Sequence, residues 1–364
     1  MKLLIVLSSK DFDNFTRRAT VEAICEQHPD TTLLFFNGIK GFPIHKPSNK
    51  KLTWKAYYSL SLGKGKNALR KAEIAIAGIY WKKFIRSFDT VFLTDPNQEL
   101  LLDFLILSQR IAYLVRDPNV LLGKNNYIKE ERILKKNPHV FGISKALCEA
   151  YVEKHYGHIP IEVITYWPNT VDLKVWSYQK PKDSEKINTS MGKVAGVIGN
   201  ITFKTDFELL RHIALDNPDV RFVVFGKILL PPEKQKVAAD IFSTNNIDFQ
   251  GYVPFEALPA IVAKWDIGLV IEKSDMEFSR YYDANKRYQY VAMGLPFVSY
   301  VYNDECKKFG KAAFIANTKE EYSQKIKEAL AIAGKPETIE HCLQVALENS
   351  SEVRAREFLE AIQK

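Results

Sequence analysis

The residue types best suited to chemistry gather in residues 279–299, Ser-Arg-Tyr-Tyr-Asp-Ala-Asn-Lys-Arg-Tyr-Gln-Tyr-Val-Ala-Met-Gly-Leu-Pro-Phe-Val-Ser. The pattern predicts a loop, a short helix from about Asp283, a stop at Gly294 and then an apolar strand, because glycine suits a left-handed helix cap and proline cannot continue a helix. Lys286 and Gln289 are three residues apart, so they share a helix face near its N-terminus. Such a place suits a phosphate. An ordinary surface helix before a core strand has the same spacing, so both interpretations stand at this point.

Apolar runs that alternate with helical patterns must position this stretch. The expected strands are 3–7, 32–36, 90–93, 111–115, 139–143, 161–165, 194–198, 221–224, 247–249, 267–271, 296–300 and 313–315. The expected helices are 17–27, 66–86, 99–109, 130–136, 145–155, 207–214, 256–263, 284–293, 319–332, 339–347 and 351–363. This alternation predicts an α/β chain with a parallel, doubly wound sheet in each half.

The domain boundary is expected in a polar linker, residues 177–193, rich in Lys, Ser and Asp. This assigns residues 1–176 to a first, acceptor-binding domain and 194–350 to a second, nucleotide-sugar-binding domain. The closing helix, 351–364, can return to the first domain. Ligands of doubly wound sheets bind beyond the carboxyl ends of the strands, so we expect them between the two domains, with closure about the linker completing the site.

Residues 279–299 resemble the donor-site helix of the GT-B glycosyltransferases (group 1, family 4-like), roughly Asn-Pro-x-Lys-hydrophobic-Tyr/Phe-Glu-Tyr-Leu-Ala-x-Gly-x-Pro-Val-Val. The matching positions are Lys286, Tyr288, Tyr290, Ala292, Gly294, Pro296 and Val298. Gln289 replaces a Glu that in the family accepts hydrogen bonds from the nucleotide ribose, and its amide oxygen can still accept one. A Lys-x-x-Gln version is expected in the xanthan glucuronosyltransferase branch, which points to UDP-glucuronate. Tyr281 stands where the related Glu-x7-Glu motif has its first Glu, so that motif is absent.

Other segments of the second half resemble the family's donor domain, in the family's order. A glycine turn after the first strand lets the backbone approach a diphosphate, lysines near strand ends can neutralise it, and a later loop holds the base. A glutamate after the fourth strand can bond a sugar hydroxyl. The resemblance assigns donor binding to Gly199, Asn200, Lys204, Gly226, Lys227, Tyr252, Val253, Glu272, Arg280, Asp283, Asn285, Lys286 and Gln289.

In the first half, residues 111–118 resemble the family's strand and acidic turn, which a Glu-x-x-hydrophobic-hydrophobic motif follows, here from Glu131. Asp117 ends that strand and is the candidate general base for the acceptor hydroxyl, a role in which a carboxylate needs its pKa raised toward working pH. A simple turn-forming Asp is the alternative interpretation, and Asp95 and Asp13 are rival bases. A base opposite the donor implies a single inverting displacement, although the residues do not settle retention against inversion.

Positive charge is concentrated in the first half of the chain. Residues 1–172 hold 25 Lys and Arg against 17 Asp and Glu, whereas the remainder holds 26 of each. Residues 46–86 carry 11 basic residues and one acid, Glu73, with aromatics interleaved. Such a segment can bind anionic lipid headgroups, bind nucleic acid, or form a solvated basic face. We assign an acceptor or membrane-facing role to Lys50, Lys51, Trp54, Lys55, Lys64, Lys66, Arg70 and Lys71.

Composition narrows the class of protein further. A chain of 364 residues, 46% hydrophobic and 26% charged, is globular and long enough for two domains. Its apolar start is too short for a signal peptide, and four scattered cysteines favour a reducing cytoplasm. Asp11 and Asp13 form an Asp-x-Asp pair, but in the first strand–helix turn, so we predict no metal. We also predict no cofactor.

The sequence thus predicts a metal-independent hexosyl- or glucuronosyltransferase of surface polysaccharide (for example capsule) synthesis. Its donor would be a nucleotide-sugar, with UDP favoured, and its acceptor a glycan carried on a lipid. The protein would be cytoplasmic and peripheral on the inner face of an anionic membrane, without nucleic acid. Two alternatives remain: a sugar-nucleotide epimerase of the same fold, and a non-catalytic glycosyltransferase-like partner subunit.

Overall fold

The computed structural model describes residues 1–9, 11–13, 15, 17–38, 44–45, 47–59, 67–76, 78–179, 192–300 and 304–364. The chain forms two compact units, one of residues 1–168 with 354–364 and one of residues 169–353. Most of the expected linker, residues 180–191, lies outside the described residues. Among the described residues, no helix is both long enough and apolar enough to span a bilayer.

The first unit is built on a parallel sheet, which among the described residues has seven strands in the order β3-β2-β1-β4-β5-β6-β7. Its strands are β1 Leu3–Leu7, β2 Thr31–Gly38, β3 Trp54–Ser59, β4 Thr90–Leu93, β5 Arg110–Val115, β6 His139–Gly142 and β7 Ile164–Tyr166. Its helices are α1 Arg18–Gln27, α2 Asn67–Ile76, α3 Gly78–Ile85, η2 Pro96–Phe104, η3 Asn119–Leu122, α4 Lys124–Leu134, η4 Leu147–Tyr151 and α5 Val152–Tyr156.

The second unit is built on another parallel sheet, with six described strands in the order β10-β9-β8-β11-β12-β13. Its strands are β8 Lys193–Ile198, β9 Val220–Phe225, β10 Ile247–Gly251, β11 Ile267–Val270, β12 Phe297–Tyr300 and β13 Ala313–Ala316. Its helices are α6 Phe207–Asp216, α7 Pro232–Phe242, η6 Phe255–Ala257, α8 Leu258–Val262, η7 Glu277–Tyr281, α9 Asn285–Ala292, η8 Asp304–Ala312, α10 Lys319–Ile332 and α11 Pro336–Glu348.

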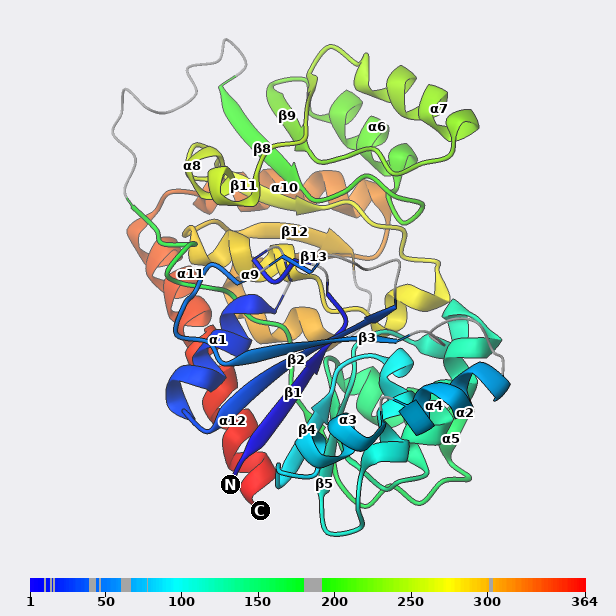
Figure 1. Ribbon diagram of the computed structural model, residues 1–364. Coiled ribbons are helices and arrows are strands. Elements are labelled where there is room, and N and C mark those ends of the chain that lie inside the picture. Colours follow the sequence, from blue (N-terminus) through cyan, green and yellow to red (C-terminus); the bar gives the residue numbers. More distant parts are fainter. Residues whose placement is uncertain are drawn as a thin grey trace. The chain divides into compact units, whose positions relative to one another are not determined.

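The last helix, α12 (Ser351–Gln363, red in Figure 1), carries the chain from the second unit back into the first. Its Phe358 packs 4.5 Å from the ring of Phe92 in β4 and 5.0 Å from that of Phe141 in β6. The central strands β1 and β11 are buried along their whole length, because helices cover both faces of a doubly wound sheet. In Figure 1, α9 and α10 lie on opposite sides of β12.

The strand order reverses once in each sheet, between β1 and β4 and between β8 and β11. The connections that follow the two strands at such a switch point run in opposite directions. They leave a crevice beyond the carboxyl ends of these strands, where doubly wound folds bind ligands. The prediction of a parallel, doubly wound sheet in each half is therefore confirmed, and each sheet has one defined place for a site.

Several predicted elements differ in detail from the structure. Strand β3 and helix α7 were not predicted, and the helix expected over 66–86 is described as two, α2 and α3. The helix expected over 99–109 is a 3-10 helix that starts earlier, at Pro96, because Asp95 and Gln98 form a capping box there. The helix expected over 145–155 begins with a π-helical turn, η4.

Candidate functional site

Two glycine turns come together beyond β8 and β9 in the second unit. Gly199 has φ +120°, and its N–H donates to Phe225 O at 3.0 Å. A Cβ on Gly226 would lie 2.0 Å from Gly199 O, so no larger residue fits there. Gly199 and Asn200 are exposed, which leaves main-chain groups of this turn accessible at the switch point. Exposed backbone of this kind, next to a cation, suits an anionic ligand.

Lys286 lies beside this turn, in the first turn of α9. Its Nζ is 3.5 Å from the position that a Cβ on Gly199 would take. The same Nζ is 2.9 Å from Oε1 of Glu272, which follows β11, and the two side chains are only 14% and 11% exposed. Tyr282 Oη lies 3.5 Å from that oxygen. Two predicted donor-binding residues are thus joined to each other at the switch point.

The other two predicted diphosphate cations lie over aromatic rings. Lys204 Nζ is 3.7 Å from the ring centroid of Phe278 and 4.9 Å from that of Tyr282. Lys227 Nζ is 4.1 Å from the ring centroid of Tyr252, whose side chain is 57% exposed. These are cation–π contacts, in which an uncharged ring attracts the ammonium group.

The loop after β8 is tied to the segment after β11 by main-chain bonds. Thr205 and Glu272 form an isolated antiparallel bridge, and Lys273 N–H donates to Lys204 O at 2.8 Å. The carboxylate of Glu272 is therefore held at the crevice by its backbone as well as by Lys286.

Asp283 is fully buried and is engaged within the second unit. Its Oδ2 accepts from Asn169 N–H at 2.9 Å and Tyr288 O–H at 2.6 Å, and lies 3.3 Å from Lys308 Nζ. Lys308 also pairs with Glu305 at 2.9 Å. This network holds the chain just before α9, and it leaves the Asp283 carboxylate buried. Asn169 and Lys308 come from distant segments, so local sequence patterns did not predict their contacts with Asp283.

The remaining residues predicted to bind the donor differ in their exposure to solvent. Gln289 is half-buried, one turn after Lys286, and no hydrogen bond of its side chain is found within the described part of the chain. Asn285, the first residue of α9, and Val253 are half-buried, and Arg280 is exposed in η7.

Two glycines that sequence reasoning overlooked let rings pack against the switch-point strands. A Cβ on Gly268 of β11 would lie 2.3 Å from the Tyr290 ring, and one on Gly196 of β8 would lie 2.0 Å from the Trp265 ring. The Tyr290 hydroxyl accepts from Ile198 N–H at 3.2 Å and lies 3.1 Å from Leu269 O, which can accept its proton. Burial raises the pKa of Tyr290, so this link between β8 and β11 stays neutral.

In the first unit, a small polar pocket of about 90 Å³ lies at the carboxyl ends of β4 and β5. It is lined by Thr94, Asp95, Pro96, Asn97, Leu114, Arg116, Asp117, Asn119, Leu122 and Asn126. Asp95 caps η2, since its Oδ1 accepts from the main-chain and side-chain nitrogens of Asn97, both at 2.8 Å. Asp117 is half-buried, and its Oδ2 accepts from Arg116 Nε at 2.9 Å. The candidate base and one of its rivals thus share one pocket.

The other rival base, Asp13, holds a loop in place. Its carboxylate accepts from Ser48 N–H at 3.1 Å and from Ser48 O–H at 2.9 Å. Arg17 at the start of α1 is 5% exposed, with its guanidinium 4.6 Å from the Trp167 ring centroid. Both residues thus make contacts within the first unit.

A buried carboxylate supports the loop that carries Asp117. Glu130 accepts from the hydroxyls of Tyr113, Tyr151 and Tyr156 at 2.8, 3.0 and 2.6 Å. It also accepts from Asn119 Nδ2 at 2.7 Å. Burial raises the pKa of Glu130, although these donors oppose the shift.

The neighbouring Glu131, which the family resemblance singled out, lies instead at the surface of the first unit. It pairs with Lys135 at 2.9 Å and lies 3.3 Å from His158 Nε2. Hydrogen bonds from Lys135 and then His158 lower the pKa of Glu131. Helix α4 thus buries Glu130 completely and leaves the next residue, Glu131, partly exposed, at 21%.

The basic segment 46–86 buries its one acid. Glu73 is 3% exposed and accepts from Tyr57 O–H at 2.6 Å and Ser59 O–H at 3.2 Å. Beside it, Ile76 and Ile79 are each 81% exposed. Tyr80 is 57% exposed. This part of the chain therefore combines exposed apolar side chains with a sequence in which basic residues far outnumber acidic ones.

The residues assigned to an acceptor or membrane role differ in exposure. Lys50, Lys51 and Lys71 are exposed, and Lys55 is half-buried over the rings of Tyr80 and Phe84. Trp54 is half-buried and packs 5.7 Å from the Phe35 ring. Lys64, Lys66 and the Arg70 side chain lie outside the described residues.

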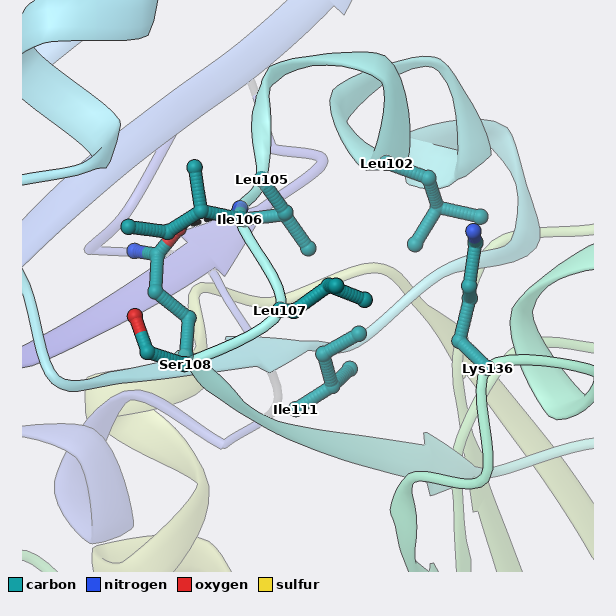
Figure 2. A pocket seen from close by; sticks show the side chains of 8 residues that line it. Leu102, Leu105, Ile106, Leu107, Ser108, Ile111 and Lys136 are labelled. Carbon is teal, nitrogen blue, oxygen red and sulfur yellow. Dashed lines mark hydrogen bonds between the residues drawn. The ribbon is translucent and has the colours of Figure 1, made fainter.

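An apolar hollow of about 610 Å³ opens at the amino end of β5 (Figure 2). It is lined by Leu102, Leu105, Ile106, Leu107, Ser108, Gln109, Ile111 and Lys136. In Figure 2, Leu107 extends between Leu102 and Ile111. The hollow lies at the opposite end of β5 from the Asp117 pocket and lacks converging polar groups, so we do not assign it to the site. Within the described chain, no group of three or more His, Cys, Asp or Glu residues is arranged to hold a metal ion.

No protein-family model and no curated protein match the chain. Several solved structures resemble it over its whole length. Sucrose-phosphate synthase from Thermosynechococcus elongatus matches with a TM-score of 0.75 and 11% identity, covering 100% of this chain and 98% of that one. HepE from Anabaena, in complex with UDP, matches with a TM-score of 0.74 and 13% identity, covering 100% of both chains.

The lipopolysaccharide outer core galactosyltransferase WaaB matches with a TM-score of 0.69 and 13% identity, covering 100% of this chain and 99% of that one. At such low identities the likeness establishes the fold, which is the GT-B arrangement of two Rossmann-like domains. The prediction of the GT-B fold is confirmed.

Proposed function

We propose that the protein is a glycosyltransferase that moves a sugar from a UDP-sugar to a glycan acceptor. One observation carries the proposal: the Gly199 turn, Lys286 and the N-terminus of α9 converge at the β8/β11 switch point. An exposed glycine turn, a lysine and a helix N-terminus together suit a diphosphate. The likeness to HepE, whose structures hold UDP and UDP-glucose, supports UDP as the nucleotide.

In this proposal the donor domain works mainly by electrostatics. Lys286 and the α9 dipole stabilise the diphosphate as it leaves, so a bound metal is not needed. Gln289 accepts from the ribose, and Tyr252 and Val253 hold the base. Lys204 and Lys227 supply further positive charge.

The acceptor side of the proposal rests on Asp117. As a general base it would take the proton of the acceptor hydroxyl while that oxygen attacks the donor sugar, which makes the reaction a single inverting displacement. Its position at the carboxyl end of β5, in a pocket with Arg116 and Asn119, supports this role.

The donor site is tested by thermal unfolding with UDP, GDP, UDP-glucose, UDP-glucuronate and GDP-mannose. A ligand that binds only the folded state adds about 2.7 kcal/mol at 100 times its Kd. We expect stabilisation by the uridine ligands that Lys286→Ala abolishes and Lys234→Ala, an exposed lysine on α7, retains. The absence of a shift with every nucleotide would contradict the proposal.

The choice among UDP-sugars follows from Gln289. Because the Lys-x-x-Gln form is expected in the glucuronosyltransferase branch, we propose UDP-glucuronate as donor. A larger shift with UDP-glucuronate than with UDP-glucose supports this choice, and the reverse order excludes it. Nucleotide binding without transfer or hydrolysis would favour a non-catalytic partner subunit.

We also propose that the acceptor is a lipid-linked glycan of surface polysaccharide synthesis and that the first unit docks on an anionic membrane. Support comes from Ile76 and Ile79, each 81% exposed, beside lysines whose one acidic neighbour in the segment, Glu73, is buried. Each Lys or Arg near an anionic surface contributes about 1 kcal/mol. An apolar side chain withdrawn from water adds about 1.5–3 kcal/mol.

Vesicle flotation tests this part. We expect binding to phosphatidylglycerol vesicles, little binding to phosphatidylcholine vesicles, and loss of binding in Ile76→Ser/Ile79→Ser. Leu215→Ser on α6, where Leu215 is 63% exposed, is the matched control. Equal binding by both variants would remove the proposed docking face.

A further inference from the structure

The ion pair between Lys286 and Glu272 occupies the place proposed for the donor diphosphate. The two charged atoms are 2.9 Å apart, and both side chains are almost entirely withdrawn from solvent. An ion pair with so little exposure is screened weakly by water, so it is stronger than a pair at the surface. Any anion that binds Lys286 must first compete with this carboxylate.

Glu272 is held at this position by the fold rather than by Lys286 alone. Its backbone bridges to Thr205, and Lys273 N–H donates to Lys204 O at 2.8 Å. The side chain can rotate away from Lys286 while the backbone stays in place. A released carboxylate would remain at the carboxyl end of β11, beside the switch point.

The other charged groups discussed for this site make contacts of other kinds. The ammonium groups of Lys204 and Lys227 lie over neutral rings, 3.7 Å from the Phe278 centroid and 4.1 Å from the Tyr252 centroid. Asp283 is fully buried in its own network with Tyr288 and Lys308. Glu272, by contrast, contacts Lys286, a cation of the proposed diphosphate site.

We infer that Glu272 is an internal competitor of the donor diphosphate: it binds Lys286 in the ligand-free protein and is displaced when a nucleotide diphosphate enters. The inference rests on the proposed function. The displaced carboxylate can accept hydrogen bonds from hydroxyls of the donor sugar, which offsets the cost of breaking the ion pair. UDP without a sugar breaks the same pair and regains nothing. Glu272 therefore favours the sugar-bearing donor over the UDP product and helps the product to leave.

Calorimetric titration of Glu272→Gln, Lys286→Ala and the double variant tests this inference. The probes are UDP and whichever UDP-sugar stabilises the wild-type protein most. We expect Glu272→Gln to bind UDP about tenfold more tightly, because a strong internal competitor is gone. Its preference for the UDP-sugar over UDP should fall. In the Lys286→Ala background, where the ion pair is already absent, the substitution at Glu272 should no longer tighten UDP binding.

Glu328→Gln is the matched control, because Glu328 also pairs with a lysine, Lys325 at 2.7 Å, but on α10. This control should leave both affinities unchanged. If wild-type protein binds no UDP, the proposed function fails. If UDP binds but Glu272→Gln binds it equally or more weakly, then Glu272 orients Lys286 for the ligand, and the inference of internal competition is overturned.

Discussion

In the second unit, β8 and β9 are followed by glycine turns with lysines close by. In the first unit, β4 and β5 are followed by carboxylates and amides. Gly199 and Lys286 represent the first kind of edge, and Asp95 and Asp117 the second. Both sheets are parallel and reverse their strand order once, so topology alone does not explain the difference.

The comparison shows that a doubly wound sheet determines where a ligand binds and that the turn residues determine which ligand it is. Glycine exposes backbone N–H groups, which suit an anion. Aspartate and asparagine fill the corresponding space with hydrogen-bond acceptors, which suit hydroxyl groups and proton transfer. The four predictions below test this division from the largest expected effect to the smallest.

The largest effect is expected from Asp117→Asn. Loss of a general base lowers kcat about 10²–10⁴-fold, while UDP affinity should stay unchanged because the substitution lies in the other unit. Transfer assays together with UDP titration measure the two effects. The rival Asp95→Asn should instead keep most of the activity and most of the stability, because asparagine caps a helix about as well as aspartate. Equal loss of activity in both variants would deny Asp117 a special role.

The next largest effect, on stability, is expected at the glycine turns that follow β8 and β9. Gly226→Ala brings a Cβ to 2.0 Å from Gly199 O, where backbone cannot yield easily. We expect a loss of about 3 kcal/mol in unfolding free energy, with weakened UDP binding. Gly251→Ala is the control, since nothing lies within 4 Å of its Cβ position and only its φ of +71° opposes the change, for about 1 kcal/mol. Urea unfolding of both variants shows whether the steric contact of a Cβ or the positive φ alone accounts for the loss of stability.

A pH effect is expected from the carboxylate edge. Burial raises the pKa of Glu130 above its ordinary value of 4.5, so between the unfolded and the folded pKa the folded state holds a proton that the unfolded state has released. Stability from this group should therefore fall as pH rises from about 4.5 through the folded pKa, by up to about 1.4 kcal/mol per pH unit. Glu130→Gln should flatten this dependence in urea unfolding between pH 4.5 and 7. An unchanged slope would show that Glu130 does not cause it.

The smallest effect is expected from Tyr290→Phe. The change leaves Ile198 N–H without its 3.2 Å partner and should cost about 1–2 kcal/mol. Tyr252→Phe is the control, because Tyr252 is 57% exposed and should change stability by less than about 0.5 kcal/mol. Thermal unfolding separates the two. Equal stability of both variants would mean that water satisfies the Ile198 amide.

Much of the fold could be predicted from the sequence, because buried parallel strands form short apolar runs. Strand β3 escaped because its residues are mostly half-buried, and Lys55 and its aromatic neighbours do not form such a run. Helix α7 escaped because Ala238 and Ile241 are its buried residues and the rest of its surface is polar. Both elements contain few buried apolar residues, so their hydrophobic pattern in the sequence is weak.

The sequence pointed to single residues of the candidate site but not to the contacts between them. Spacing identified Lys286 on α9, yet its ion pair with Glu272 joins two elements that only the folded chain brings together. Similarly, Glu130 and Glu131 are neighbours in sequence, and tertiary packing decides that the first is buried under three tyrosines. Local patterns carry no information of this kind.

The glycines of β8 and β11 each share one volume with a ring from elsewhere in the chain. Gly268 and Tyr290 divide one such space, and Gly196 and Trp265 divide another. If either glycine is replaced by a residue with a Cβ, the aromatic residue that packs against it must be replaced by a smaller one. In an alignment of relatives, positions 268 and 290 should therefore change together, as should 196 and 265, so that the packing beneath the switch point leaves a covariation signal in sequences alone.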